Sequence, residues 1–442
     1  VGGCLPDPAG HDRWGRSSHR RDSRRATPFC LVPPPIHVAS ARGSGLRGRY
    51  ESPPLLSQPA HGVSFPVCGG EGGGMTRRLK AAVLGGGSWG TALAHLVASH
   101  GHETLLWLRC EETAKEINTD RTNAKYLGDV QIHEAVQATT DLEAAARFAD
   151  TVIVAIPSKA LRRVARDLGD YLTGDQILVS ATKGMEADTF QRISEILKQE
   201  TCVRKVGALS GPNLAREVMA GHPSATVVAS TYEEVIVQAE RLLAGPRFRL
   251  YGNFDIVGVE TGGALKNVIA IAAGMSSGLG FGANTLSMLM TRGLAEICRM
   301  GEKLGAERST FQGLAGIGDL IATCTSTLSR NHTLGRRLAT GEDVSVIQED
   351  MHMVAEGVNT TVAVHRHAAR LGVDMPITEA MHQVLFEQAD IPDVIQSLMT
   401  RTSVYESDYT AIRAPGYVSS SVVEHAARIE AAARGDSAED GG

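Results

Sequence analysis

The feature that most constrains the fold is a glycine-rich turn at residues 85–90 (GGGSWG), directly after a short apolar run at 81–84. The spacing of Gly85, Gly87 and Gly90 lets a backbone turn sharply, approach a pyrophosphate closely and begin a helix whose first amides face negative charge. The apolar run is typical of a buried parallel strand. The turn therefore predicts a dinucleotide-binding site.

The residues after the turn complete a βαβ unit. Residues 91–99 place apolar side chains on one helical face, and residues 103–109 resemble a second strand. That strand ends at Arg109, where the adenine ribose would lie. An acidic residue there would accept from a 2′-hydroxyl, whereas an arginine suits a 2′-phosphate or stacks on adenine. We therefore expect NADP in preference to NAD, although Glu111 and Glu112 dilute the positive field and a solvated strand-end arginine is the alternative.

Composition bounds the class of protein. With 442 residues, 43% of them hydrophobic and only 5% aromatic, the chain can bury a large aliphatic core divided between two or three domains. No apolar run approaches the roughly 20 residues that span a bilayer. Seven cysteines without paired metal-ligand spacing argue against a metal site and a disulfide framework. We expect a soluble, cytoplasmic protein.

Residues 1–74 differ from the rest of the chain. They contain nine arginines and no lysine, together with proline, glycine and serine in no helical or strand period. We expect a disordered N-terminal extension upstream of Met75, with an organelle transit peptide as the alternative. Without this segment the chain carries a net charge of about −9, which argues against nucleic acid as a partner.

The order of apolar runs predicts an α/β fold, a doubly wound Rossmann-type sheet followed by an all-helical C-terminal domain. Further strands are expected at 151–156, 176–180, 206–209 and 225–229. Helices are expected at 263–273, 286–304, 354–371 and 377–386. The predicted domains are a dinucleotide-binding domain at 75–262, a helical substrate-binding domain at 263–410 and a flexible tail at 411–442.

Polar residues follow the predicted strands, at the edge where an open parallel sheet gathers its ligands. Ser158 follows one strand, Lys183 the next, and Gly211 stands in a turn after a third. Lys183 would lie near the nicotinamide, where a cation could hold an anionic substrate. A surface lysine in a turn is the alternative.

Two further groups lie in the helical half. Lys266 stands in a small and apolar helix opening, so it either faces solvent or is buried; burial would lower its pKa and suit proton transfer to a carbonyl. Asp319 follows three glycines, and Ser329 and Asn331 flank Arg330. That group could hold a phosphate. A helix cap at Ser329 is the alternative, and it is compatible with that role.

Together these motifs resemble, in order and spacing, the bacterial NAD(P)-dependent glycerol-3-phosphate dehydrogenases. The resemblance covers about residues 75–409. It rests on the glycine turn and six further motifs, which lie at residues 182–184, 210–212, 265–267, 316–319, 329–331 and 355–357. It implies reversible reduction of dihydroxyacetone phosphate to sn-glycerol 3-phosphate, which supplies phospholipid backbones.

The resemblance also implies roles for individual residues. Lys266 would be the proton donor or acceptor. Contacts to the dinucleotide would come from Gly85, Gly87, Ser88, Trp89, Gly90, Arg109, Lys183, Ala215, Arg330, Val354 and Glu356. The substrate would be surrounded by Lys183, Gly211, Asn213, Lys266, Asp319, Ser329, Arg330 and Asn331. Asn213 departs from the hydroxyl residue that the family usually has, which puts that contact in doubt.

Two other functions compete with this one. A dehydrogenase of the same two-part plan, acting on a hydroxyacyl thioester or a sugar acid, would not need the phosphate grip at Arg330 and would favour an acidic residue at position 109. A non-catalytic dinucleotide sensor would leave Lys266 and Asp319 unexplained. Helical second domains of this kind often pair, so a homodimer is a further expectation.

Overall fold

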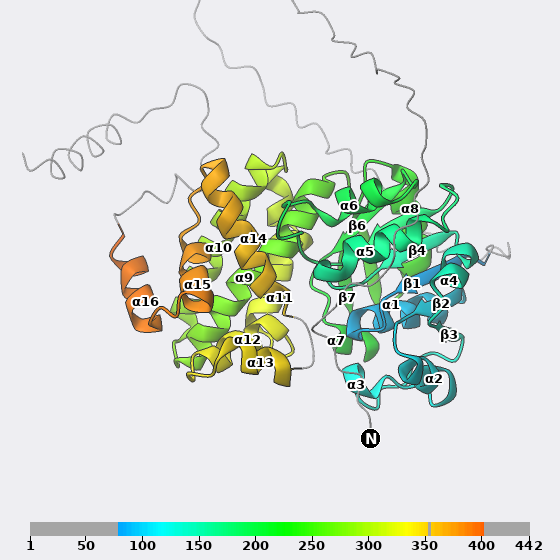
Figure 1. The fold of residues 1–442 in the computed structure, drawn as a ribbon, viewed down its shortest axis with the longest axis horizontal. Coiled ribbons are helices and arrows are strands. Elements are labelled where there is room, and N and C mark those ends of the chain that lie inside the picture. Colours follow the sequence, from blue (N-terminus) through cyan, green and yellow to red (C-terminus); the bar gives the residue numbers. More distant parts are fainter. Residues whose placement is uncertain (1–77, 352–354, 402–442) are drawn as a thin grey trace, which may run out of the picture. The chain divides into compact units, whose positions relative to one another are not determined.

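The computed structural model describes residues 78–351 and 355–401. The extension expected at 1–74, the tail expected at 411–442 and Val354 lie outside the described residues. Figure 1 shows the described chain as strands and flanking helices, blue to green, followed by helices in green to orange.

The first half is built on one eight-stranded sheet. Its strand order is β3-β2-β1-β4-β5-β6-β7-β8, and every neighbouring pair is parallel except β6 and β7. The strands are β1 (Lys80–Leu84), β2 (Glu103–Trp107), β3 (Val136–Thr139), β4 (Thr151–Val154), β5 (Ile177–Ser180), β6 (Val206–Ser210), β7 (Ser224–Ala229) and β8 (Phe248–Asn253). The order reverses between β1 and β4, so the crevice that binds ligands in such sheets opens directly after β1.

Helices connect successive strands, as parallel pairing requires. They are α1 (Ser88–Ser99), α2 (Glu111–Thr119), α3 (Ala124–Leu127), α4 (Leu142–Phe148), α5 (Ser158–Gly169), α6 (Ile193–Glu200), α7 (Ala215–Met219) and α8 (Glu233–Leu243). Most of the core of this half lies in two apolar clusters. One includes Val83, Leu93 and Leu106, and the other includes Leu84 and Leu178. Alternate residues of β1 thus point into opposite layers, which explains why that strand is apolar throughout.

The second half is helical and packs around one long helix. Its elements are α9 (Ile256–Gly278), α10 (Ala283–Lys303), the 3₁₀ helix η1 (Arg308–Gln312), the π-helical turn η2 (Leu314–Gly318), α11 (Asp319–Thr325), α12 (Arg330–Leu338), α13 (Val344–Asp350), α14 (Glu356–Leu371), α15 (Pro376–Phe386) and α16 (Ile391–Met399). Helix α9 contacts α10, α11, α12, α14 and α15 (Figure 1). The helical half therefore has its core on α9.

Helices α9 and α12 cross with their backbones in contact. A Cβ atom on Gly274 would lie 2.0 Å from the carbonyl oxygen of His332, and one on Gly335 would lie 1.9 Å from that of Ile271. Only glycine permits this approach. By length and composition α9 could also cross a membrane, which differs from the sequence expectation, but 94% of its apolar window is buried inside the protein. It is the core helix of this half.

The structure confirms the α/β fold and corrects some of its details. The strands β3 and β8 were not predicted, because both mix polar residues with apolar ones. The expected boundary at Gly262 falls inside α9. The change from sheet to helices comes at Asp255, whose side chain caps α9 by accepting from the amide of Gly258 at 2.8 Å. Gly258, Gly262 and Gly263 thus lie within a helix.

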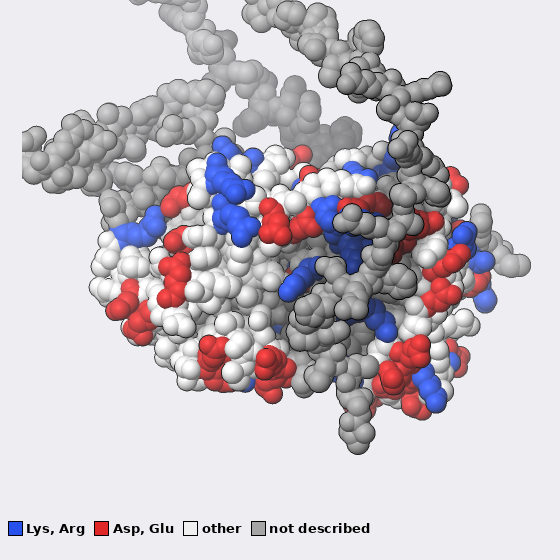
Figure 2. All heavy atoms as spheres, viewed as in Figure 1, with Lys and Arg blue, Asp and Glu red and all other residues white. Residues whose placement is uncertain are grey.

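Charged side chains of both signs are interspersed on the described surface. Figure 2 shows lysines and arginines beside aspartates and glutamates on the face in view. Several of these side chains form ion pairs. Examples are Arg162 Nε with Glu186 Oε1 at 2.6 Å and Lys205 Nζ with Glu234 Oε2 at 2.8 Å. Such pairing leaves local fields weak and screened by salt.

Candidate active site

The glycine turn has the close packing that its spacing predicted. Gly85 has φ +123°, and a Cβ there would lie 2.3 Å from the carbonyl oxygen of Ala155 in the chain after β4. A Cβ on Gly90 would lie 1.9 Å from the carbonyl oxygen of Gly85. Gly87 is different, because a Cβ there would meet no atom within 4 Å. A Cβ on Gly86 would lie 2.7 Å from Cβ of Leu108, so the turn is packed against the protein except at Gly87.

The start of α1 suits an anionic group. Gly87 is its N-cap and provides no side chain, so the first amides of the helix have no side-chain cap. An α-helix leaves four such amides without partners within the helix, and its dipole adds partial positive charge. Half-buried Trp89 has an indole nitrogen that is buried and has no hydrogen-bond partner. The open cradle at Gly87 and the uncapped amides fit the pyrophosphate of a dinucleotide.

Arg109 lies where the sequence placed it, just after β2. Its side chain is exposed. Acidic residues follow it at Glu111 and Glu112 in the first turn of α2, and Cys110 donates to the Glu112 carboxylate at 2.9 Å. The guanidinium therefore reaches solvent beside the crevice.

Two lysines and an aspartate meet at the contact between the sheet and the helical half. Lys183, after β5, places its Nζ 2.7 Å from Oδ2 of Asp319 at the start of α11. Lys266, on α9, places its Nζ 3.3 Å from Oδ1 of the same carboxylate. Asp319 is 2% exposed and Lys266 4%. A buried carboxylate therefore bridges two ammonium groups that lie 83 residues apart in sequence.

Lys266 is held by two further acceptors. Its Nζ donates to Oγ1 of Thr323 at 2.6 Å and to Oδ1 of Asn267 at 3.1 Å. Burial lowers the pKa of Lys266 to about 8; the charge of Lys183 also lowers it, while Asp319 raises it. An amine with this pKa exchanges a proton readily near neutral pH, which a general acid or base requires.

The loop after β6 carries Gly211 and Asn213. The Gly211 carbonyl accepts from Nζ of Lys183 at 2.8 Å. The Asn213 amide donates to the Ala225 carbonyl at 3.1 Å, and its oxygen accepts from the Thr226 hydroxyl at 2.9 Å. Asn213 therefore ties the loop to β7, and one of its two amide hydrogens remains for a ligand.

The start of α12 brings together the other predicted phosphate-binding residues. Ser329 is its N-cap and accepts from the amide of His332 at 3.3 Å, so the helix-capping alternative is the geometry observed. Asn331 is buried, donates to Asn267 at 3.0 Å and accepts from the amide of Gly357 at 3.0 Å. Arg330 is exposed on one side. Desolvation by the protein atoms around it lowers the pKa of its guanidinium, and the carboxylate of Glu356 opposes that shift.

Glu356 links the two halves of the chain. Its carboxylate accepts from the amide of Ser158 at 3.0 Å and from the Ser158 hydroxyl at 2.5 Å, at the N-terminus of α5. Burial raises the pKa of Glu356, and the bonds from Ser158 oppose that shift. Ala215 is half-buried at the start of α7. Val354, the remaining predicted cofactor contact, lies outside the described residues.

Three polar residues of this region were absent from the predicted contacts. Thr323 and Asn267 hold Lys266, and Ser158 holds Glu356. Asn267 and Ser158 stand in motifs that the sequence had already singled out. Thr323 lies one helical turn after Asp319 on α11, so the i, i+4 spacing on that helix was an available signal.

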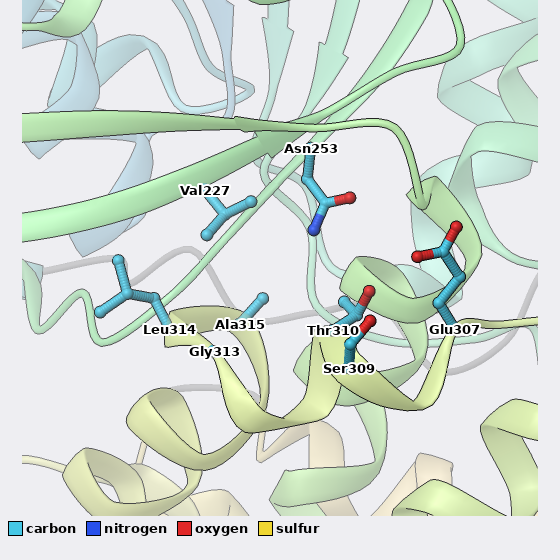
Figure 3. A pocket seen from close by; sticks show the side chains of 8 residues that line it. All are labelled: Val227, Asn253, Glu307, Ser309, Thr310, Gly313, Leu314 and Ala315. Carbon is cyan, nitrogen blue, oxygen red and sulfur yellow. The ribbon is translucent and has the colours of Figure 1, made fainter. Parts of the chain in front are cut away.

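A separate shallow hollow lies between β7, β8 and the segment around η1 and η2. It has a volume of about 150 Å³ and is lined by Val227, Asn253, Thr310 and Leu314 among others (Figure 3). Neither Lys183 nor Lys266 lines it. The charged cluster and this hollow are therefore distinct features.

A doubly wound sheet with a glycine turn, joined to a helical half that supplies a buried lysine, defines a two-part nicotinamide-dependent dehydrogenase. Comparison with known proteins specifies the family. Residues 80–236 match the model of the NAD-dependent glycerol-3-phosphate dehydrogenase N-terminus, and residues 255–396 match that of the C-terminus. The chain belongs to the NAD(P)-dependent glycerol-3-phosphate dehydrogenases, oxidoreductases that act on glycerol 3-phosphate.

Curated relatives agree with this family. The chain is 45% identical over 331 residues to a glycerol-3-phosphate dehydrogenase (NAD(P)+) from Macrococcus caseolyticus, covering 74% of this chain and all of the relative. It is 47% identical over 325 residues to that of Nitratidesulfovibrio vulgaris strain DP4, covering 73% and 98%. The chain is also similar to a crystal structure of glycerol-3-phosphate dehydrogenase from Coxiella burnetii, with 35% sequence identity and a TM-score of 0.70. The match covers 73% of this chain and 99% of that chain. The fold, the family and the activity predicted from sequence are confirmed.

Proposed function

We propose that the chain reduces dihydroxyacetone phosphate to sn-glycerol 3-phosphate with Lys266 as the proton donor, and that it prefers NADPH. The observation that carries this proposal is the bridge Lys183–Asp319–Lys266, which holds a buried amine of lowered pKa between the sheet edge and α9. In the cell we propose a cytoplasmic enzyme that supplies phospholipid backbones, and a homodimer.

The dinucleotide would bind along the crevice after β1. The pyrophosphate would occupy the cradle of Gly85, Gly87 and Gly90 at the amides of Ser88 and Trp89, with Arg109 at the adenine ribose. The remaining proposed cofactor contacts are Lys183, Ala215, Arg330, Val354 and Glu356. When bound, the reduced nicotinamide would supply a hydride, a hydrogen with its electron pair, to the carbonyl carbon of the substrate.

The substrate would lie between the sheet edge and α12. As its carbonyl is reduced, negative charge develops on the oxygen, and Lys266 would give that oxygen a proton while Lys183 stabilises the charge. Arg330 would hold the unreactive phosphate, so that binding energy from that end orients the carbonyl. The remaining substrate contacts would be Gly211, Asn213, Asp319, Ser329 and Asn331.

Lys266 can act as proposed only if its bonds rearrange. Its three protein acceptors, on Thr323, Asn267 and Asp319, use all three hydrogens of the ammonium group. The contact with Asp319 is the longest of the three at 3.3 Å. The substrate oxygen would therefore compete first with Asp319 for a hydrogen of Lys266.

The experiment follows absorbance of the reduced cofactor with dihydroxyacetone phosphate, using NADPH and NADH in parallel. We expect turnover with both and a higher kcat/KM with NADPH. Arg109→Ala should lower kcat/KM for NADPH about tenfold, because a charge-assisted contact to the cofactor is lost. The kcat/KM for NADH should stay within twofold of the wild-type value. Arg147→Ala, on the exposed surface of α4, is the control. An unchanged ratio between the two cofactors in Arg109→Ala would contradict the proposed NADP preference.

A further inference from the structure

Asn123 is buried beside the glycine turn, at the N-cap position of α3. Its Nδ2 lies 2.9 Å from the carbonyl oxygen of Gly86 and 2.9 Å from Oγ1 of Thr91. Gly86 is inside the turn, and Thr91 is in the first turn of α1. One amide group thus bridges the loop and the helix that together would receive the pyrophosphate.

The orientation of this amide follows from its partners. A backbone carbonyl only accepts hydrogen bonds, so the nitrogen of Asn123 must face Gly86. The oxygen, Oδ1, is then buried without a hydrogen-bond partner. A buried polar atom without a partner is costly, and an apolar residue at this position would avoid that cost. The two bonds, one to the turn at Gly86 and one to α1 at Thr91, are therefore the contribution that an asparagine makes here.

The segment that carries Asn123 is tied down on both sides. Arg121 has φ +58°, a left-handed conformation that non-glycine residues adopt at a cost, and its guanidinium donates to the Val136 carbonyl at 2.7 Å. The carboxylate of Glu116 accepts from the Thr122 hydroxyl at 2.8 Å and from the amide of Ala124 at 2.7 Å. These contacts fix the backbone before and after Asn123. They therefore also fix the position from which its side chain reaches Gly86 and Thr91.

We propose that Asn123 is a positioning residue for the dinucleotide, because it holds the glycine turn and the first turn of α1 in the relative geometry that receives the pyrophosphate. This role rests on the proposed cofactor site. Asn123 acts through Gly86 and Thr91. Its loss should therefore weaken cofactor binding without changing the chemistry at Lys266.

The isosteric change Asn123→Asp tests this role. An ionised aspartate cannot donate and would repel the Gly86 carbonyl oxygen. We expect both Kd and KM for NADPH to rise at least tenfold at pH 8, while kcat at saturating NADPH and KM for dihydroxyacetone phosphate stay within twofold. Because a protonated carboxyl regains one donor, the affinity of Asn123→Asp for NADPH should partly recover as pH falls toward 5.5, relative to wild type.

Asn118→Asp is the matched control. Asn118 exchanges two hydrogen bonds with the backbone of Ala138, at 2.9 and 2.8 Å, and does not touch the turn. Asn118→Asp should weaken the contact with Ala138, and its affinity for NADPH should match that of wild type. Thr91→Val removes one acceptor of the Asn123 amide and gives a second measurement if Asn123→Asp folds poorly; we expect a three- to fivefold rise in Kd for NADPH.

The outcomes separate this inference from the proposed cofactor site. If the wild-type protein fails to bind NADPH, the cofactor site itself is wrong. If wild type binds and both Asn123→Asp and Thr91→Val bind equally well, only the role of Asn123 is overturned. A fall in kcat that matches the rise in KM, or an equal effect in Asn118→Asp, would also overturn it, because either result indicates a general structural role.

Discussion

Single residues in this protein obtain their chemistry from burial and from the charges beside them. Lys266 shows this most directly. A lysine in water holds its proton firmly at neutral pH, but here the loss of water on all sides lowers the pKa to about 8. Asp319 keeps the shift from being larger by stabilising the ammonium form.

Lys266→Met tests the proposed proton donor. Methionine fills a similar volume but cannot donate, so we expect kcat to fall about 10³-fold, within the range that general acids contribute. The Kd for NADPH, measured by cofactor fluorescence, should stay within twofold. Lys205→Met, at an exposed ion pair, is the control. Normal turnover in Lys266→Met would contradict the assignment.

The pH dependence should follow the protonation of Lys266. Reduction of the ketone needs the ammonium form, so kcat for reduction should fall as pH rises through about 8. Oxidation of glycerol 3-phosphate needs the neutral amine and should rise over the same interval. In Asp319→Asn the counter-charge is gone, so the fall in kcat for reduction should begin at lower pH. Initial rates from pH 6 to 10 in both directions measure this, and a fall that moves to higher pH would contradict it.

Among the helices and strands, several ends are capped by residues from distant elements. The start of α15 is one. Its first amides, on Ile377 and Thr378, donate to the carboxylate of Glu296 on α10 at 2.5 and 3.2 Å. Burial raises the pKa of Glu296 to about 7, while these donors oppose the shift. A carboxylate from another helix thus replaces the local cap that the sequence lacks there.

Glu296 should make the stability of the protein depend on pH. A carboxyl group whose pKa is raised on folding stabilises the fold fully below its unfolded pKa and loses that contribution as pH rises through its folded pKa. The change from about 4.5 to about 7 corresponds to about 3 kcal/mol. We expect the free energy of unfolding of wild type, minus that of Glu296→Gln, to fall by about this amount between pH 4.5 and 8. Urea denaturation at several pH values measures it, and a difference that stays constant with pH would contradict it.

At the level of the whole molecule, two carboxylates of the helical half, one buried and one half-buried, bind the sheet half. Glu260 on α9 accepts from the amide and hydroxyl of Ser194 at 2.8 and 2.5 Å and from Arg192 at 3.1 Å, at the start of α6. Glu356 makes a corresponding contact with Ser158 at the start of α5. Two helix N-termini of the sheet half are therefore fixed by acidic side chains of the helical half.

Removal of Glu260 should weaken this connection. Glu260→Ala leaves Arg192 and the Ser194 amide without their buried partner, so we expect a loss of about 3 kcal/mol in the free energy of unfolding. Glu234→Ala, which breaks an exposed pair with Lys205, should cost less than about 1 kcal/mol. Thermal unfolding of both variants measures the difference. Equal unfolding midpoints for Glu260→Ala and Glu234→Ala would show that the buried contact adds no more stability than the exposed pair.

The sequence alone was sufficient for those features that depend on local backbone geometry and residue order. The turn at 85–90 was recognisable because only glycine tolerates the approach seen at Gly85 and Gly90, and the run of apolar strands predicted a doubly wound sheet. The ordered motifs indicated the family and its activity. These features are local, so a one-dimensional pattern carries them.

Tertiary structure decided what depends on meetings between distant segments. Lys266 could have faced solvent or been buried, and only the packing of α9 against α11 settled that it is buried. No spacing in the chain indicated that Asp319 bridges two lysines, that Glu356 caps α5 or that Asn123 reaches Gly86. The glycine turn shows both sides of this division. Its own residues determine its shape, but a side chain that folding brings from 37 positions away holds it in place.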